Sequence, residues 1–376
     1  MSTDPDLLYS EEEEALRAAV RDLLTDHCDA AGVLARAETD TPYDPALWKS
    51  LADGMGLAGL LVPEEWGGQG ATHREAAVVL EELGRFVAPV PYLTSAVVAT
   101  EALLACAGEG TGGTGEAGEI EAAVGLLARL ASGRTIGVLA VPLHLGADAA
   151  HPAVRVENGA LHGEVTGVAD AAVADVLLVP AQDGALYAVD AGDATVTPQV
   201  SLDLTRPLAA VALDGARASR LGRAESAVRR ALRAAAGLLA SEQLGIADWA
   251  LTETVAYLKE RKQFNRPVGG FQALKHRLAQ VWLEVVHLRA AARAAADALA
   301  TGEDTDVTTA VAQAYAAPAA VHAVEEALQL HGGIGMTWEH PVHLYLKRAK
   351  ADSIAYGTAG AHREALAALV DLRPPA

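Results

Sequence analysis

Cysteine is scarce in this sequence: the 376 residues include two, Cys28 and Cys106, far apart and outside any CxxC motif. Neither a disulfide framework nor a thiolate metal site is indicated, and a reducing cytoplasm is the simplest compartment to expect. The start of the chain lacks a basic stretch followed by an apolar one, and no run of about 18 uninterrupted apolar residues occurs. We therefore expect a soluble protein that is not exported.

Positive charge is also in deficit, with 29 Lys and Arg against 49 Asp and Glu and a formal net charge of -20. Such a balance works against general attraction to phosphate backbones or to anionic lipid. Nucleic acids and membrane surfaces are therefore not expected as partners.

Two common catalytic motifs are missing. None of the 12 histidines lies in an HExxH motif or is spaced with acids as metal ligands are, so we expect no metal site. The His331-Gly332-Gly333 segment resembles a hydrolase oxyanion loop, but no GxSxG nucleophile motif accompanies it.

The length of the chain suggests two or three domains. Apolar residues recur at helical spacing over 1–133, and short Val- and Leu-rich runs separated by turn residues over 134–222 predict a small antiparallel β sheet or barrel. Helical spacing returns over 223–376. There it predicts a bundle of four long helices at 223–263, 271–300, 305–330 and 341–371.

One informative stretch lies at 260–276, where the first long helix of the bundle ends. Arg261, Lys262 and Arg266 place three cations within six residues of an otherwise acidic chain, and Phe264 and Phe271 lie beside them. Cations stabilise a helix C-terminus, so a capping role is one interpretation. The other is a site for an anionic, partly aromatic ligand.

A second stretch, at 329–341, joins two predicted helices through Gly332, Gly333 and Gly335. Glycines allow a ligand to approach the backbone closely, and the amide of Gln329 offers both a donor and an acceptor. A plain helix-terminating turn is the alternative.

At these two stretches the sequence strongly resembles the acyl-CoA dehydrogenase family, whose members carry an ERxxFGxPxxxFQ segment and a QxxGGxG turn. The PEEWGGQG segment at 63–70 and LKRAK at 346–350 also resemble the family. The resemblance covers nearly the whole chain. It implies an N-terminal helical domain, a small antiparallel β barrel and a C-terminal four-helix bundle.

The resemblance also implies a flavoenzyme in which FAD lies extended across a subunit interface. Carried over by position, three groups of residues would contact it. Arg261, Gln263 and Phe264 match contacts to the pyrophosphate and ribityl region, with Phe271 and Gln272 in the same cradle. Gln329, Gly332 and Gly333 match contacts to the adenine end and pyrophosphate, and Thr358 matches a further flavin contact.

The family's catalytic base is not where the resemblance leads us to look for it. The family uses the glutamate of a YEGT segment, whereas Tyr356 stands at that position here, and a phenol with a pKa near 10 is mostly protonated at neutral pH. The helix position that carries the base in some relatives falls on Ala235. Seven residues further, Glu242 interrupts an apolar stripe, so it is either an alternative base or a buried structural pair.

The β region departs from the family as well. The flavin-facing GxKxWIT strand corresponds to 163–170, where Gly167 and Ala169 replace the tryptophan and the threonine, and 140–142 lacks the hydroxyl that bonds the ring. Residues offered to a neighbour's flavin are kept, whereas those for the chain's own flavin ring and base are lost. This pattern is expected of one half of a heteromeric dehydrogenase, a type found in bacterial steroid side-chain breakdown.

The leading hypothesis is thus an FAD-linked acyl-CoA dehydrogenase chain of lipid metabolism that forms α,β-unsaturated thioesters in a dimer of dimers. Its partners would be a second such chain and an acceptor like electron-transfer flavoprotein. A self-sufficient homo-oligomer using Glu242 and a non-catalytic thioester-binding or partner-stabilising homologue are the alternatives. An acyl-carrier-protein substrate would need a basic patch, for which Arg229, Arg230 and Arg233 are the candidates.

Overall fold

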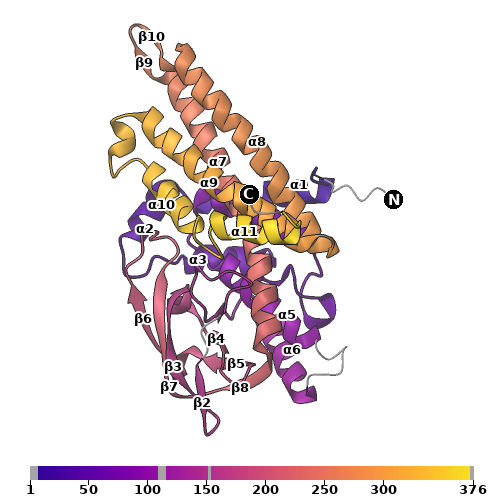
Figure 1. Ribbon diagram of the computed structural model, residues 1–376. Coiled ribbons are helices and arrows are strands. Elements are labelled where there is room, and N and C mark those ends of the chain that lie inside the picture. The colour runs from indigo at the N-terminus through magenta and orange to yellow at the C-terminus, as the bar shows by residue number, and fades with distance from the viewer. Residues whose placement is uncertain (1–6, 109–115, 151–153, 373–376) are drawn as a thin grey trace.

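The computed structural model describes residues 7–108, 116–150 and 154–372 (Figure 1). Ser10 with Glu13, and Thr72 with Glu75, form reciprocal caps at the starts of the first and fourth helices. A fully buried π-helical stretch, η4 (Tyr92–Ala99), runs into the fifth helix. The α-helices before the strands are α1 (Glu11–His27), α2 (Ala30–Ala37), α3 (Pro45–Lys49), α4 (His73–Phe86), α5 (Thr100–Gly108) and α6 (Ala117–Ala131).

The strands form two four-stranded sheets, in the orders β1-β4-β5-β8 and β2-β3-β7-β6. All neighbours pair antiparallel except β1 and β4, which are parallel. The chain passes from the second sheet to the first at Ala218, directly between β7 and β8. The bounds are β1 (Gly137–Leu139), β2 (Arg155–Glu157), β3 (Ala160–Ala169), β4 (Val176–Pro180), β5 (Ala185–Asp190), β6 (Thr195–Gln199), β7 (Leu208–Arg217) and β8 (Ser219–Arg223).

The expected order of helices, a small antiparallel sheet region and helices is confirmed, but the strands do not close into the barrel that the resemblance implies. The first sheet ends at β1 and β8, which pair with no further strand of the described chain. Instead, β1 packs beside η4 and β8 packs beside α6. Helices that cover the sheet edges remove the need for the edges to pair with each other.

The C-terminal helices are α7 (Ala224–Glu260), α8 (Gln272–Thr301), α9 (Thr305–His331), α10 (Val342–Asp352) and α11 (Ala359–Leu369). The first three match the predicted long helices. The structure has two helices, α10 and α11, where the sequence predicts a single fourth helix. The chain turns between them, and Tyr356 and Gly357 in this turn have φ of 53° and 107°. Residues with a left-handed backbone cannot be part of an α-helix, so α10 and α11 cannot join.

Helix α7 extends along most of the molecule, from the sheets to the end opposite them. At that end the short strands β9 (Lys262–Gln263) and β10 (Arg266–Pro267) form a hairpin (Figure 1). It crosses α4 in backbone contact. A Cβ on Gly84 would lie 2.1 Å from the carbonyl oxygen of Glu242, and one on Gly245 would lie 1.9 Å from that of Glu81. These two glycines are what allow the helices to approach so closely.

Candidate functional site

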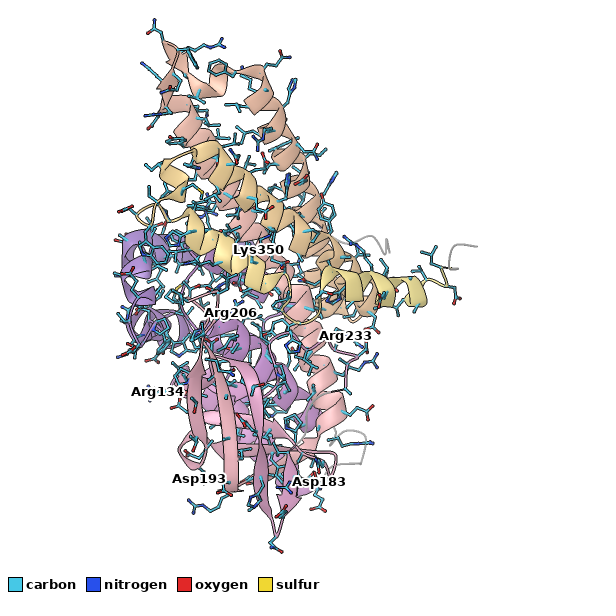
Figure 2. All side chains as sticks on the ribbon, turned by 60° about the vertical axis from the view of Figure 1, so that its left-hand side comes forward. Arg134, Asp183, Asp193, Arg206, Arg233 and Lys350 are labelled. Carbon is cyan, nitrogen blue, oxygen red and sulfur yellow. The ribbon has the colours of Figure 1, made fainter. Side chains whose placement is uncertain are left out.

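Two arginines hold the buried carboxylate of Glu242 in the middle of α7. Arg206, from the segment between β6 and β7, donates from Nη2 to both carboxylate oxygens, at 2.7 and 2.6 Å. Arg348 of α10 donates from Nη1 to Oε1 at 2.5 Å. All three residues are buried, and Arg206 lies where the strands meet the C-terminal helices (Figure 2). The cluster thus ties α7 and α10 to the sheet region.

Two aspartates complete this buried ion cluster. Arg348 donates from Nε to Asp203 at 2.5 Å, and Arg206 donates from Nη1 to Asp352 at 2.6 Å. Three carboxylates therefore face two guanidinium groups. Burial, and then the charge of Glu242, raises the pKa of Asp352 to about 8, and its Oδ2 has no hydrogen-bond partner among the described residues. Asp352 is therefore the carboxylate that carries a proton at neutral pH, which leaves two negative charges beside the two arginines.

This arrangement bears on the role of Glu242. Burial alone would raise the pKa of Glu242, but the charges of Arg206 and Arg348 outweigh burial and lower it. Both of its oxygens accept from cations, and its side chain lines neither of the two cavities near Tyr356. A general base needs a free lone pair within reach of the substrate. The geometry favours the buried structural pair that the sequence left open.

Tyr356 lies buried in the turn between α10 and α11. Its backbone N–H donates to the carbonyl of Leu143 at 2.8 Å, so the turn is fixed against the segment that follows β1. Burial raises the pKa of the Tyr356 phenol. The ionised form that a base requires is therefore even less accessible than in a free tyrosine.

Tyr356 lines a very small hollow, with about 10 Å³ of free space. Residues from three parts of the chain form its walls: η4, β1 with the segment after it, and the end of β3. They are Thr94, Val98, Val138, Leu139, Val141, Leu143 and Ala169.

A much wider groove of about 580 Å³ also reaches Tyr356. Its walls come from 144–149 and from α7, α9 and α11. Thr358 lines it, and its hydroxyl accepts from the backbone N–H of Ala361 at 3.2 Å, which caps α11. Thr358 therefore has a structural role whether or not it contacts a ligand.

The three arginines considered as a basic patch are each paired with a carboxylate. Arg233 bonds Asp306 at 2.6 Å beside the groove (Figure 2). The other pairs are Arg229 with Asp148 at 2.9 Å and Arg230 with Glu101 at 2.6 Å. Local acids neutralise this surface.

The two motif stretches come together at the far end of α7. The hydroxyl of Tyr257 donates to the carbonyl of His331 at 3.4 Å, which joins the end of α7 to the glycine turn after α9. Phe264 is 89 % exposed at the hairpin turn and meets Phe271 edge to face, with 6.2 Å between ring centroids. The remaining candidates of this tip are exposed as well: Arg261, Gln263, Gln272, Gln329, Gly332 and Gly333.

The structure thus separates the predicted site residues into three places. Eight lie at the exposed tip, Tyr356 and Thr358 border the groove, and Glu242 lies inside the ion cluster. The sequence did not single out Arg206, Asp203 or Asp352, and Arg348 appeared only within the LKRAK match. Their partners are distant in the chain, so no local spacing could reveal them.

Within the described residues, no group of three or more His, Cys, Asp or Glu side chains is arranged to hold a metal ion. No described helix combines the length and the apolar character needed to cross a membrane.

Comparison with known proteins adds the family. The description "acyl-CoA dehydrogenase, N-terminal domain" matches residues 10–111, and "acyl-CoA dehydrogenase, C-terminal domain" matches residues 217–370. Acyl-CoA dehydrogenase IpdE2 of Mycolicibacterium smegmatis is 36% identical over 348 residues, which cover 93% of this chain and 95% of that protein.

Two solved structures are also similar. The ChsE4-ChsE5 complex from Mycobacterium tuberculosis contains a chain with a TM-score of 0.84 and 29% identity, covering 98% of this chain and 100% of that one. A variant of the Tcur3481-Tcur3483 steroid ACAD contains a chain with a TM-score of 0.81 and 32% identity, covering 96% of this chain and 98% of that one.

Proposed function

The chain belongs to the acyl-CoA dehydrogenase family, and from this membership we propose that it is one half of a heteromeric, FAD-dependent acyl-CoA dehydrogenase. In this proposal a second family member seats the flavin ring and supplies the base. The present chain completes the cofactor cradle with its exposed tip. The reaction of the pair turns an acyl thioester into its α,β-unsaturated product.

The observation that carries the proposal is the distance between the tip and the groove that Tyr356 and Thr358 line. Ala236 borders the groove beside Tyr356, and Arg261 follows it by 25 residues at the end of α7. At a rise of 1.5 Å per residue, about 37 Å of helix separates them. This distance supports a tip that serves a flavin held by another chain.

FAD is the cofactor of this family, and the tip has the chemistry to hold part of it. Arg261 and Arg266 bring positive charge for a pyrophosphate, and Phe264 offers an exposed aromatic face. A Cβ on Gly332 or Gly333 would meet no described atom within 4 Å, so the backbone there is open to a ligand. When bound, FAD accepts the hydride that leaves the β carbon of the substrate.

Neither of the two residues considered as a base, Glu242 and Tyr356, is suited to that role, and this supports the same proposal. The carboxylate of Glu242 is occupied by two arginines, and the raised pKa of Tyr356 keeps its phenol protonated. Removal of the α proton then falls to a carboxylate of the partner chain. The same facts weigh against the self-sufficient homo-oligomer with Glu242 as base.

Similar structures support the pairing. Two of them are paired chains by name, ChsE4-ChsE5 and Tcur3481-Tcur3483, and the second is called a steroid ACAD. We carry both features over as proposals: a pair of unlike chains, which we expect to assemble as a dimer of two heterodimers, and a steroid-derived acyl-CoA as the first substrate to test. A flavoprotein acceptor and a cytoplasmic setting complete the proposal, together with domains at 1–133, 134–222 and 223–376.

The test is to purify the chain alone and together with acyl-CoA dehydrogenase-like chains encoded beside it. Flavin absorbance near 450 nm is measured per chain after size exclusion. We expect little flavin on the chain alone, one flavin per pair of chains in the complex, and dye reduction that depends on acyl-CoA. One flavin per chain in the isolated protein would support the homo-oligomer. A flavin-free, inactive complex would support the non-catalytic homologue.

A matched pair of variants tests the cradle. Arg261→Ala removes a cation from the tip and should lower flavin retention in the complex at least tenfold. Arg134→Ala removes another exposed cation, which lies near the sheets, and should leave retention unchanged (Figure 2). Equal retention in the two variants would remove the tip from the cofactor site.

A further inference from the structure

The small hollow at Tyr356 lies where the resemblance places the chain's own flavin ring. The ring-facing positions are 140–142, Gly167 and Ala169, and of these Val141 and Ala169 line the hollow directly. The backbone N–H of Leu143 donates to the carbonyl of Gly167 at 2.8 Å, which fastens the two ring-facing segments together. Thr94 and Val98 of η4 also line the hollow.

The space left in this hollow is too small for a flavin ring. Its free volume of about 10 Å³ corresponds to one water molecule at most. An isoalloxazine is three fused six-membered rings. The hollow therefore does not fit a flavin ring, whereas the tip offers groups that suit part of FAD.

The turn that carries Tyr356 is held at several points. Its backbone adopts a left-handed φ of 53°, which a tyrosine keeps only where the surroundings enforce it. Its N–H bonds Leu143, and its carbonyl oxygen lies 3.2 Å from Nε2 of His362. Asp352, four residues earlier, is fixed in the ion cluster by Arg206. The position of the ring is thus imposed from both sides of the turn.

We propose that Tyr356 is a plug: its side chain fills the flavin-ring hollow of this chain, so that the ring can be seated only in the partner chain. The inference rests on the proposed function, since it explains how a chain that retains the cradle accepts no flavin ring of its own. It assigns Tyr356 a role in cofactor placement in place of the general-base role. Gly167 and Ala169 lack the tryptophan and threonine side chains that would contact the flavin ring, and the side chain of Tyr356 occupies the space that the ring would need.

The test uses lumiflavin, the flavin ring system with a methyl group in place of the ribityl chain, because it probes the hollow without the tip. Binding to the isolated full-length chain is followed by quenching of lumiflavin fluorescence. Wild type and Tyr356→Phe, which keeps the ring, should show no saturable binding. Tyr356→Gly removes the side chain at a left-handed position that glycine tolerates, and should bind at least tenfold more tightly than wild type.

Two results would overturn the plug. Saturable binding of lumiflavin to the wild-type chain, unchanged by Arg261→Ala, would show an open hollow, and this result needs no variant at Tyr356. A Tyr356→Gly chain that unfolds at the wild-type temperature and still binds no lumiflavin would show that another group closes the site. Failure of the proposed function is separate, since it is observed as a wild-type complex without flavin or turnover.

Discussion

Replacing Glu242 by glutamine separates a structural carboxylate from a catalytic one. The carboxylate accepts three hydrogen bonds from Arg206 and Arg348. A glutamine carbonyl can take over the bonds at Oε1, but its amide group then points at Nη2 of Arg206, donor against donor. The cluster also loses one negative charge.

The magnitude follows from the charges in the cluster. Breaking a buried ion pair costs about 3–5 kcal/mol because the remaining charge is left without a partner. The charge of Glu242 is one of the causes of the raised pKa of Asp352, so without it the pKa of Asp352 falls. Ionisation of Asp352 then restores two negative charges beside two positive ones. We therefore expect a net loss of about 2–3 kcal/mol.

The assay is urea unfolding at pH 7, followed by circular dichroism, with turnover of the partner complex measured alongside. Glu325→Gln is the matched control: Glu325 bonds Lys350 at 2.7 Å on the surface, with 48% of its side chain exposed. An exposed pair contributes less than about 1 kcal/mol. If Glu242→Gln were as stable as Glu325→Gln but lost turnover about a thousandfold, Glu242 would be a base and the reasoning above would be refuted.

Two further predictions concern pH and the helix crossing. The pKa of Asp352 is raised to about 8 in the folded chain, whereas the unfolded chain releases this proton near pH 4. The contribution of Asp352 to the free energy of unfolding therefore declines as the pH rises from about 4 to about 8. Asp352→Asn lacks this group, so its urea midpoint at pH 8.5 relative to that at pH 5 should be higher than in wild type, and a pH dependence equal to that of wild type would contradict this assignment. Gly245→Ala would bring a methyl group to 1.9 Å from the Glu81 carbonyl and should lower stability by about 3 kcal/mol or more. Gly125→Ala, where a Cβ meets no described atom within 4 Å, should be neutral or slightly stabilising, and similar melting temperatures for the two variants would show that the crossing relaxes.

The tip could be predicted from sequence because its chemistry is local. Residues 260–276 form one hairpin between two helices, so cations and phenylalanines that are near in sequence stay near in space. The break at Tyr356 was missed because no proline marks it and the apolar spacing continues on both sides. The barrel was predicted because strand spacing does not reveal which edges helices will cover.

The ion cluster shows where local reasoning ends. The position of Glu242 on an apolar stripe correctly indicated a buried carboxylate. Its partners Arg206 and Arg348 lie 36 and 106 residues away, and Asp352 lies 146 residues from Arg206. Which distant charge meets which is decided by the packing of the sheets on α7 and α10, and no pattern in the sequence encodes that packing.

The glycine crossing of α4 with α7 also has a consequence for synthesis of the chain. Residues 76–84 of α4 are buried in the folded protein, and α7 supplies much of their cover. The ribosome must add the 174 residues between Phe86 and Glu260 before α7 is complete, which takes about 9–35 s at 5–20 residues per second. During that time the face of α4 that α7 covers in the folded protein stays exposed on the nascent chain. We therefore expect chaperones to bind the nascent chain during translation. We also expect chains that stall before residue 260 to aggregate.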